Sequence, residues 1–321
     1  MQPPTYQDVL EARLRVYAHM RPSPLMRHPL LDEWIGAPVW VKHENHNPTG
    51  AFKIRGGLNL ISQLSPDERR RGVITASTGN HGQSIAFACR AVGVVCRIVV
   101  PVGNNPDKNA AMRALGAEVV EHGRDFDEAR EYVESIVERE GRRYVHSANE
   151  PHLIAGVGTY ALEIFDELPE VDYVFAPIGG GSGACGCCLV RTARGSRAKV
   201  IGVQASRADA FTRSWRGPER VSTERADTFA EGVATRTTYD LTYGILKAEL
   251  DEVVTLEEDE LRTALREALQ RTHNLVEGAG AASIAAARQY GPALVGKEVV
   301  CVMSGGNADM RTLSSALLSQ T

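Results

Sequence analysis

A lysine lies at the centre of the short segment of this chain that is most suggestive of chemistry. Residues 47–57 read NPTGAFKIRGG, and Lys53 follows a Val-rich run at 39–41 and a Gly-containing turn. This pattern predicts that Lys53 lies in the first turn of a helix, where partial burial disfavours the ammonium and leaves a nucleophilic amine. For a lysine taken by itself, a surface side chain is the simpler interpretation, because charged side chains mostly face water. Spacing alone does not decide between these interpretations.

Two Gly-rich loops follow other Val/Ile-rich runs and indicate anion binding. Residues 76–82 read ASTGNHG, and their backbone N–H groups and small hydroxyls suit a carboxylate or a phosphate. Ser77 or Thr78 could instead do no more than cap a helix. Residues 177–186 read PIGGGSGACG, in which the glycines around Ser182 allow close approach of the backbone to an anion before a helix N-terminus.

The second loop also matches a dinucleotide-binding pattern. Its glycines fit G-x-G-x-x-G, but a nicotinamide site needs an Asp or Glu about 20 residues further on. The next Val-rich run ends at Gln204, which has no carboxylate, so a phosphate site is the better interpretation. A fourth loop, MSGGN at 303–307, carries Ser304, which either directs its hydroxyl into the site or belongs to a simple turn.

The cysteines and histidines do not form a metal-binding pattern. Cys185, Cys187 and Cys188 are clustered but lack the two-residue gaps and the second ligand pair of a zinc site. Buried small thiols in a helix are the simpler interpretation. His43 and His46 have no matching third ligand. We therefore expect no metal site.

Strands and helices must position these loops, and the sequence alternates between them. Val/Ile-rich runs predict strands at 39–41, 73–75, 97–100, 118–121, 173–178, 200–203, 253–256 and 299–302. Amphipathic stretches predict helices at 125–140, 150–168 and 258–273, and Thr5 with Asp8 predicts a capped opening helix at about 5–20. Such alternation indicates βαβ units, and eight strands exceed a usual single sheet, so we expect two α/β lobes with mainly parallel sheets.

Composition and charge narrow the class of protein. The chain has 321 residues and a net charge of −4, so it lacks the basic excess that nucleic-acid binding would need. It has no apolar run long enough for a transmembrane helix and no apolar segment near its start that resembles a secretory signal. Six cysteines in a chain of this length are read as reduced thiols, which predicts a cytoplasmic protein.

Taken in order, the four loops resemble those of the fold type II pyridoxal-phosphate (PLP) enzymes, specifically the threonine/serine dehydratase and serine racemase family. The resemblance extends from about residue 5 to 315. It implies an α/β fold like that of the tryptophan synthase β subunit, with two open, twisted, mainly parallel sheets and helices on both faces. It also implies a large PLP-binding domain of residues 1–62 plus 151–321, a small mobile domain of residues 63–150, and a homodimer.

The resemblance assigns a role to individual residues. Lys53 would hold PLP as a Schiff base and act as the catalytic base, and Thr78 is a second candidate catalytic residue. The other cofactor-binding positions are Phe52, Asn80, Gly179, Gly180, Gly181, Ser182, Gly183, Gly232 and Ser304. The substrate-binding positions are Ser77, Thr78, Gly79, His81 and Thr235.

Three departures from the family pattern affect the expected activity. Ala51 replaces the usual serine two residues before the lysine. Thr78 stands where serine racemases carry a proton-transferring Ser, so racemisation is a possible side activity. The cation site of serine racemases would fall at Gln204 and Ala210, which provide no carboxylates, so we expect no Mg²⁺ or Ca²⁺ dependence through that site.

The implied function is β-elimination from an L-β-hydroxy amino acid to a 2-oxo acid and ammonia. L-Threonine and L-serine are the default substrates, and the SANEP variation at 147–151 keeps L-threo-phenylserine and 3-hydroxyaspartate open. We expect no regulatory domain after residue 321, as is typical of the catabolic form without effectors. A serine racemase-like isomerase, a β-replacement synthase and a non-catalytic binding protein remain as alternatives, with a nicotinamide oxidoreductase last.

Overall fold

The larger of two β-sheets forms the centre of the molecule. We describe residues 1–318 of a computed structural model. The sheet has the strand order β1-β2-β10-β7-β8-β9, in which only the β1–β2 pair is antiparallel. Its strands are β1 (Leu25–Arg27), β2 (Trp40–His43), β7 (Tyr173–Pro177), β8 (Lys199–Ala205), β9 (Glu252–Leu256) and β10 (Val299–Met303). Strands β7, β8 and β10 are apolar and almost wholly buried, as expected for a parallel sheet covered on both faces.

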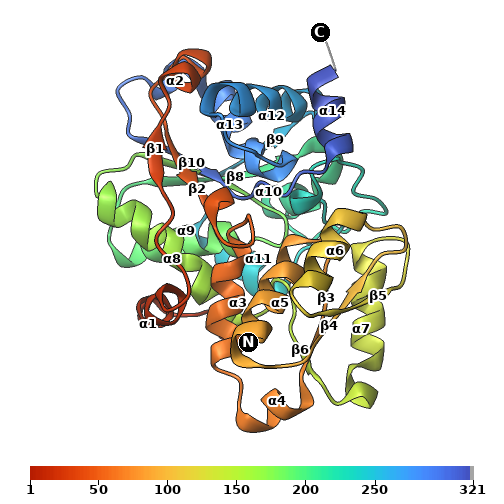
Figure 1. Ribbon diagram of the computed structural model, residues 1–321. Coiled ribbons are helices and arrows are strands. Elements are labelled where there is room, and N and C mark those ends of the chain that lie inside the picture. Colours follow the sequence, from red (N-terminus) through yellow and green to blue (C-terminus); the bar gives the residue numbers. More distant parts are fainter. Residues whose placement is uncertain (319–321) are drawn as a thin grey trace.

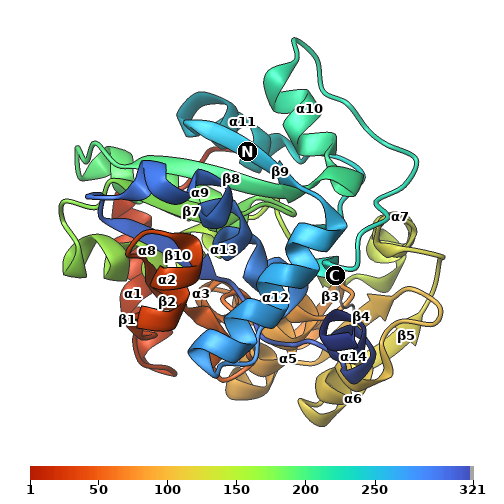
Figure 2. The same ribbon diagram turned by 90° about the horizontal axis from the view of Figure 1, so that it is seen from above.

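Helices cover both faces of this sheet (Figures 1 and 2). One face packs on a core with α1 (Tyr6–Tyr17), α3 (Lys53–Ser62), α8 (Pro151–Glu167), α9 (Ser182–Ala193) and α11 (Asp240–Glu249). The other packs on a core with α2 (Pro29–Ile35), α12 (Glu258–Thr272), α13 (Gly278–Tyr290) and α14 (Met310–Leu318). Helix α10 (Ala210–Arg216) and the 3₁₀ turns η1 (Glu44–His46), η2 (Ser206–Ala208), η3 (Glu231–Val233) and η4 (Gly291–Leu294) complete this part.

A second, smaller sheet is built wholly from residues between 73 and 144. Its four strands are parallel in the order β5-β4-β3-β6 (Figure 1, lower right). They are β3 (Val73–Ala76), β4 (Cys96–Val100), β5 (Glu118–Glu121) and β6 (Arg143–Tyr144), with helices α4 (Pro66–Arg71), α5 (Asn80–Val92), α6 (Pro106–Ala114) and α7 (Phe126–Glu140). Helix α5 packs against α3, and this contact joins the small sheet to the larger one.

The expected fold class is therefore confirmed, with two mainly parallel sheets flanked by helices. All eight expected strands form within one or two residues of their predicted bounds, and the Thr5–Asp8 capping box starts α1. Strands β1 and β6 were not predicted, because three and two residues respectively are too short for a periodic signal. The boundary between the two proposed domains stays a prediction. No helix in residues 1–318 is long and apolar enough to cross a membrane.

Candidate active site

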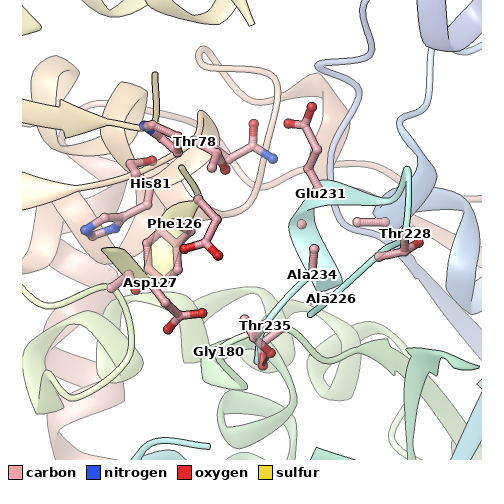
Figure 3. Close-up of a pocket in the computed structure, with 18 of the residues that line it drawn as sticks. Thr78, His81, Phe126, Asp127, Gly180, Ala226, Thr228, Glu231, Ala234 and Thr235 are labelled. Atoms are coloured by element: carbon pink, nitrogen blue, oxygen red, sulfur yellow. Dashed lines mark hydrogen bonds between the residues drawn. The ribbon is translucent and has the colours of Figure 1, made fainter. Parts of the chain in front are cut away.

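A cavity of about 1000 Å³ lies where the carboxyl ends of strands from both sheets face each other (Figure 3). The loops after β2, β3, β7 and β10 all contribute to its wall, as expected for ligand sites of open α/β sheets. Of the residues named from the sequence, these line it: Phe52, Lys53, Ser77, Thr78, Asn80, His81, Gly179, Gly180, Gly181, Ser182, Gly183, Gly232, Thr235 and Ser304. Gly79 is not among the lining residues, and a Cβ atom there would lie 2.7 Å from the side chain of Lys108.

Lys53 is the first residue of α3, and its amine points toward the start of α9. Its Nζ donates a hydrogen bond to Ser182 Oγ at 3.2 Å and lies 5.2 Å from the ring centre of Phe52. Burial lowers the pKa of Lys53 to about 8, because no carboxylate nearby offsets the cost of desolvating the ammonium. A sizeable fraction of the side chain is thus a neutral amine near pH 7.5, as a nucleophile or a general base requires.

The Gly-rich loop after β7 forms a cradle at the N-terminus of α9. A Cβ atom on Gly179 would lie 2.2 Å from the carbonyl oxygen of Gly232, so only glycine permits this close approach. Gly181 has φ of +90°, which directs the chain into α9 at Ser182. The first N–H groups of α9 have no partner within the helix and therefore suit a phosphate.

The loop after β3 presents a second helix N-terminus to the same cavity. The hydroxyl oxygen of Ser77 accepts hydrogen bonds from the N–H groups of Gly79 and Gly82, at 3.0 and 2.8 Å. Ser77 therefore acts as a cap for this loop while still lining the cavity. Thr78 is partly exposed to the cavity, and its backbone carbonyl accepts from Asn104 at 3.1 Å. A small carboxylate could bind here at the N-terminus of α5.

The His81 ring is buried and neutral. Its Nε2 lies 3.0 Å from Thr75 Oγ1, whose own hydrogen is donated to the carbonyl of Val145 at 2.7 Å. Nε2 must therefore carry the proton, which leaves Nδ1 as an acceptor. Burial, with the nearby Lys53 charge, lowers the pKa of His81 to about 3. The backbone at the start of α5, rather than an imidazolium, would then meet a substrate carboxylate.

Asn80 is held at both ends of its amide group. Its Nδ2 donates to Glu277 Oε1 at 2.6 Å, while its Oδ1 accepts from Asn307 at 2.8 Å. This arrangement fixes the amide orientation and leaves one Nδ2 hydrogen for a ligand. Glu277 is buried, and desolvation raises its pKa. Sequence reasoning missed Glu277, because a single Glu at the N-cap of α13 carries no motif.

Three further predicted residues lie on the floor and rim of the cavity. The carbonyl of Ser304 accepts from the N–H of Phe52 at 3.0 Å, which holds the loop after β10 against the start of α3. Gly232 lies in η3, and Thr235 Oγ1 is 3.5 Å from the carbonyl of Gly179. The loop of residues 230–236 thus supports the anion cradle.

The remaining segments singled out in the sequence have structural roles. In the 146–151 segment only Ser147 lines the cavity, while His146 Nδ1 accepts from two backbone N–H groups. The side-chain amide of Gln204 bonds Ile178 and Thr212, tying β8 to its neighbours. The clustered cysteines of α9 are buried free thiols. Within residues 1–318 no group of His, Cys, Asp or Glu side chains could hold a metal ion.

Comparison with known proteins identifies the family. The model of the family described as "Pyridoxal-phosphate dependent enzyme" matches residues 16–305. The chain belongs to this family. It is 38% identical to an L-threonine ammonia-lyase of Thermotoga maritima (96% of this chain, 77% of the relative) and 31% identical to an L-threo-3-hydroxyaspartate ammonia-lyase of Saccharomyces cerevisiae (98% and 96%). The solved structure of a processed threonine deaminase isoform from Solanum lycopersicum superposes with a TM-score of 0.91 at 31% identity (98% and 90%).

The cavity fits the cofactor of the pyridoxal-phosphate dependent enzyme family. The α9 cradle, where a Cβ at Gly179 would clash with the carbonyl of Gly232, suits the phosphate. The amine of Lys53 lies next to this cradle, through its bond to Ser182, and could hold the aldehyde carbon. Asn80 offers a fixed donor and Ser304 a hydroxyl group at the cavity wall, while Phe52 provides an aromatic face.

Proposed function

We propose that this protein is an ammonia-lyase that converts an L-β-hydroxy amino acid, L-threonine or L-serine, to a 2-oxo acid and ammonia. The observation that carries the proposal is the amine of Lys53, with its pKa lowered to about 8, next to the anion cradle and facing the cavity that the start of α5 also lines. This arrangement brings together a covalent anchor and base, a phosphate site and a carboxylate site. The ammonia-lyase relative supports the same activity.

Each group of residues has a defined task in this reaction. Pyridoxal phosphate, when bound, supplies the electron sink for the carbanion character that develops at Cα. The N-terminus of α5 binds and orients the substrate carboxylate, and the Nζ of Lys53 removes the Cα proton. Overall, the β-hydroxyl and the proton taken from Cα leave as water, and the released enamine tautomerises and hydrolyses to the 2-oxo acid and ammonia. Ser304 would offer the ring nitrogen of bound cofactor a neutral hydroxyl rather than a carboxylate, which would favour elimination over transamination.

The hydroxyl of Thr78 favours a second, minor activity. It lies on the cavity wall, where it could return a proton to Cα and produce some racemisation. Its β-branch restricts rotation about χ1, so we expect elimination to dominate. We further propose that the small domain of residues 63–150 moves to exclude water, and that the protein is a cytoplasmic homodimer, as the family resemblance implies.

The test is a product assay on the PLP-loaded protein. It is incubated separately with L-serine, L-threonine, L-threo-phenylserine and L-threo-3-hydroxyaspartate, and 2-oxo acid and ammonia are measured together. We expect equal amounts of both products, lost in Lys53→Ala and retained in Lys297→Ala, a variant at an exposed lysine before the amino end of β10. The absence of 2-oxo acid from all four substrates would overturn the proposal and direct attention to chiral analysis for a racemase.

A further inference from the structure

An arginine and two aspartates form a charged link across the cavity wall. Arg236, in the loop between η3 and α11, donates from Nε to Asp127 Oδ2 at 3.1 Å and from Nη2 to Asp125 Oδ1 at 3.2 Å. Both aspartates lie at the start of α7, beside which the long segment after α10 runs (Figure 2). All three residues line the cavity that contains Lys53, and Figure 3 shows Asp127 across the cavity from Ala234 and Thr235.

Asp127 is the most buried member of this link. Only 4% of it is exposed, and its Oδ1 has no hydrogen-bond partner among residues 1–318, although the Nε of Arg130 lies 3.6 Å away. Arg130 is itself paired with Glu134 at 2.7 Å. The hydroxyl of Tyr239, on the same wall, is also buried without a partner in the described chain. This part of the wall therefore has a carboxylate oxygen and a neutral hydroxyl buried within it, and among residues 1–318 it presents no free cation.

The other cationic groups on the cavity wall are engaged or in solvent. Lys108 is paired with Glu231, and Arg124 with Glu128 at 2.6 Å. The side chain of Arg225 is exposed, so water and salt screen its charge. Lys53 is needed for the chemistry itself. A second carboxylate carried by a substrate would therefore enter a cavity in which the buried cations other than Lys53 already have anionic partners.

We infer that the Asp127–Arg236 pair determines substrate specificity by excluding β-hydroxy amino acids that carry a second carboxylate. This inference rests on the proposed function. A desolvated carboxylate needs a cationic partner, and here it would face Asp127 while Arg236 is occupied. Phe126, Ala226 and Ala234 line the same region, so a neutral side chain meets no such penalty. The favoured substrates are those with an uncharged β-substituent.

The test compares two substrates on the same PLP-loaded protein. The readout is the ratio of kcat/KM for L-threo-3-hydroxyaspartate to that for L-threonine, which cancels general losses of activity. In Asp127→Asn the guanidinium of Arg236 loses one anionic partner, and we expect the ratio to rise at least about tenfold, the effect of one hydrogen bond between charged groups. Adding Arg236→Gln to that variant removes the new partner and should abolish the gain.

Two further variants keep the test decisive. Glu131→Gln removes one negative charge from the exposed face of α7, outside the cavity, and should leave the ratio within about twofold of the parent value. Asp125→Asn replaces Asp127→Asn if the latter fails to fold, because Asn still caps α7.

The outcomes separate the two proposals. Any one of four results overturns the inference: a parent ratio near or above one, an unchanged ratio in Asp127→Asn, an equal rise in Glu131→Gln, or a gain that survives Arg236→Gln. Turnover of threonine would still uphold the proposed function in each of these cases. No 2-oxo acid from these two substrates, from L-serine or from L-threo-phenylserine with the parent protein overturns both.

Discussion

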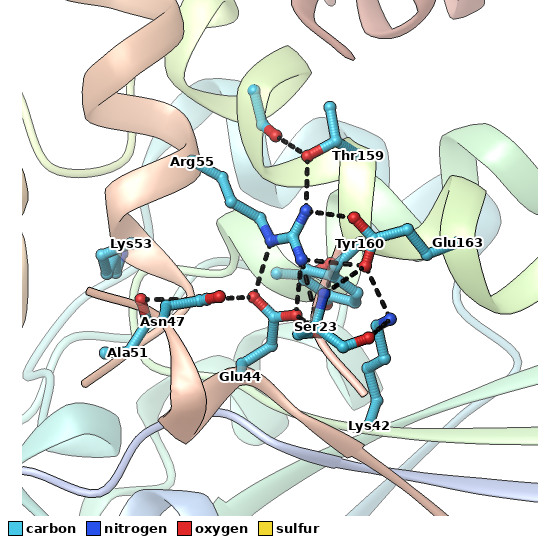
Figure 4. Close-up of polar contacts among 12 residues, drawn as sticks. Ser23, Lys42, Glu44, Asn47, Ala51, Lys53, Arg55, Thr159, Tyr160 and Glu163 are labelled. Atoms are coloured by element: carbon cyan, nitrogen blue, oxygen red, sulfur yellow. Dashed lines mark hydrogen bonds and ion pairs between the residues drawn. The ribbon is translucent and has the colours of Figure 1, made fainter. Parts of the chain in front are cut away.

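Replacing Arg55 by methionine should destabilise the protein strongly, because its guanidinium neutralises two buried carboxylates. Arg55 lies two residues after Lys53 on α3 and is fully buried (Figure 4). It bonds Glu44 through Nε and Nη2 at 2.7 and 2.9 Å, and Glu163 through Nη1 and Nη2 at 2.6 and 2.9 Å. Lys42 adds a second cation, 2.6 Å from Glu163. The cluster therefore has two positive and two negative groups.

The magnitude follows from this charge balance. Burial alone would lower the pKa of Arg55, but the two carboxylates raise it above its usual value, so the guanidinium stays charged. Methionine leaves two buried carboxylates with only Lys42 to neutralise them. Removing one partner of a buried ion pair costs about 3–5 kcal/mol. At an unfolding entropy of about 2.1 cal/mol/K per residue, that corresponds to a decrease in Tm of roughly 4–7 °C for a chain of 321 residues.

Thermal and urea unfolding of the PLP-loaded protein, followed by circular dichroism, measure this loss. Arg70→Met is the matched control, because Arg70 is 70% exposed and its pair with Asp67 should contribute less than about 1 kcal/mol. Adding Glu44→Gln to Arg55→Met leaves one cation and one anion and should recover part of the lost stability.

Two results would refute this account. One is an Arg55→Met variant whose free energy of unfolding lies within about 1 kcal/mol of the parent, which is below the range for an unpaired buried charge. The other is a double variant with Glu44→Gln that is no more stable than Arg55→Met alone.

The pH dependence of stability provides an independent check of the charge balance. Burial would raise the pKa of Glu163, but Arg55 and Lys42 lower it. The stability that ionised Glu163 contributes is therefore present above the pKa that this residue has in the unfolded chain. It is lost as the pH falls through the pKa of Glu163 in the folded protein.

Three further predictions concern the site and its scaffold. PLP uptake by cofactor-free protein, followed by absorbance, should rise with pH with an apparent pKa of about 8, because only the neutral amine of Lys53 reacts; a midpoint near 10 would contradict this. Glu277→Ala should weaken PLP binding about tenfold in fluorescence titrations, since Asn80 loses the bond that orients it; unchanged affinity would disprove that role. Gly156→Ala should lower the free energy of unfolding in urea by about 1–3 kcal/mol, because its Cβ would lie 2.4 Å from a carbonyl oxygen of α3. The control Gly244→Ala, with open space around it, should be neutral or stabilising.

Much of the architecture could be predicted from local sequence. Apolar runs such as 173–178 and 299–302 have only one stable location, the interior of a parallel sheet, so hydrophobicity alone identifies them. The Thr5 and Asp8 cap likewise depends only on residues three apart. The short strands β1 and β6 had no such signal, because their pairing with β2 and β3 is their main support.

The residues of the candidate site likewise include some that the sequence reveals and others that only the structure reveals. Lys53 and the glycines of the 179–183 loop stand out in the sequence, since a special backbone conformation or a helix N-terminus restricts residue choice over a few adjacent positions. Glu277 and Asp127 are single polar residues at the starts of helices and Arg236 is one in a loop, and only the approach of the two sheets brings them to the cavity. The sequence alone therefore determined the chemistry available to this protein. The tertiary structure decided which charges meet at the cavity, because pairing across more than 100 residues depends on distance in space and leaves no local pattern.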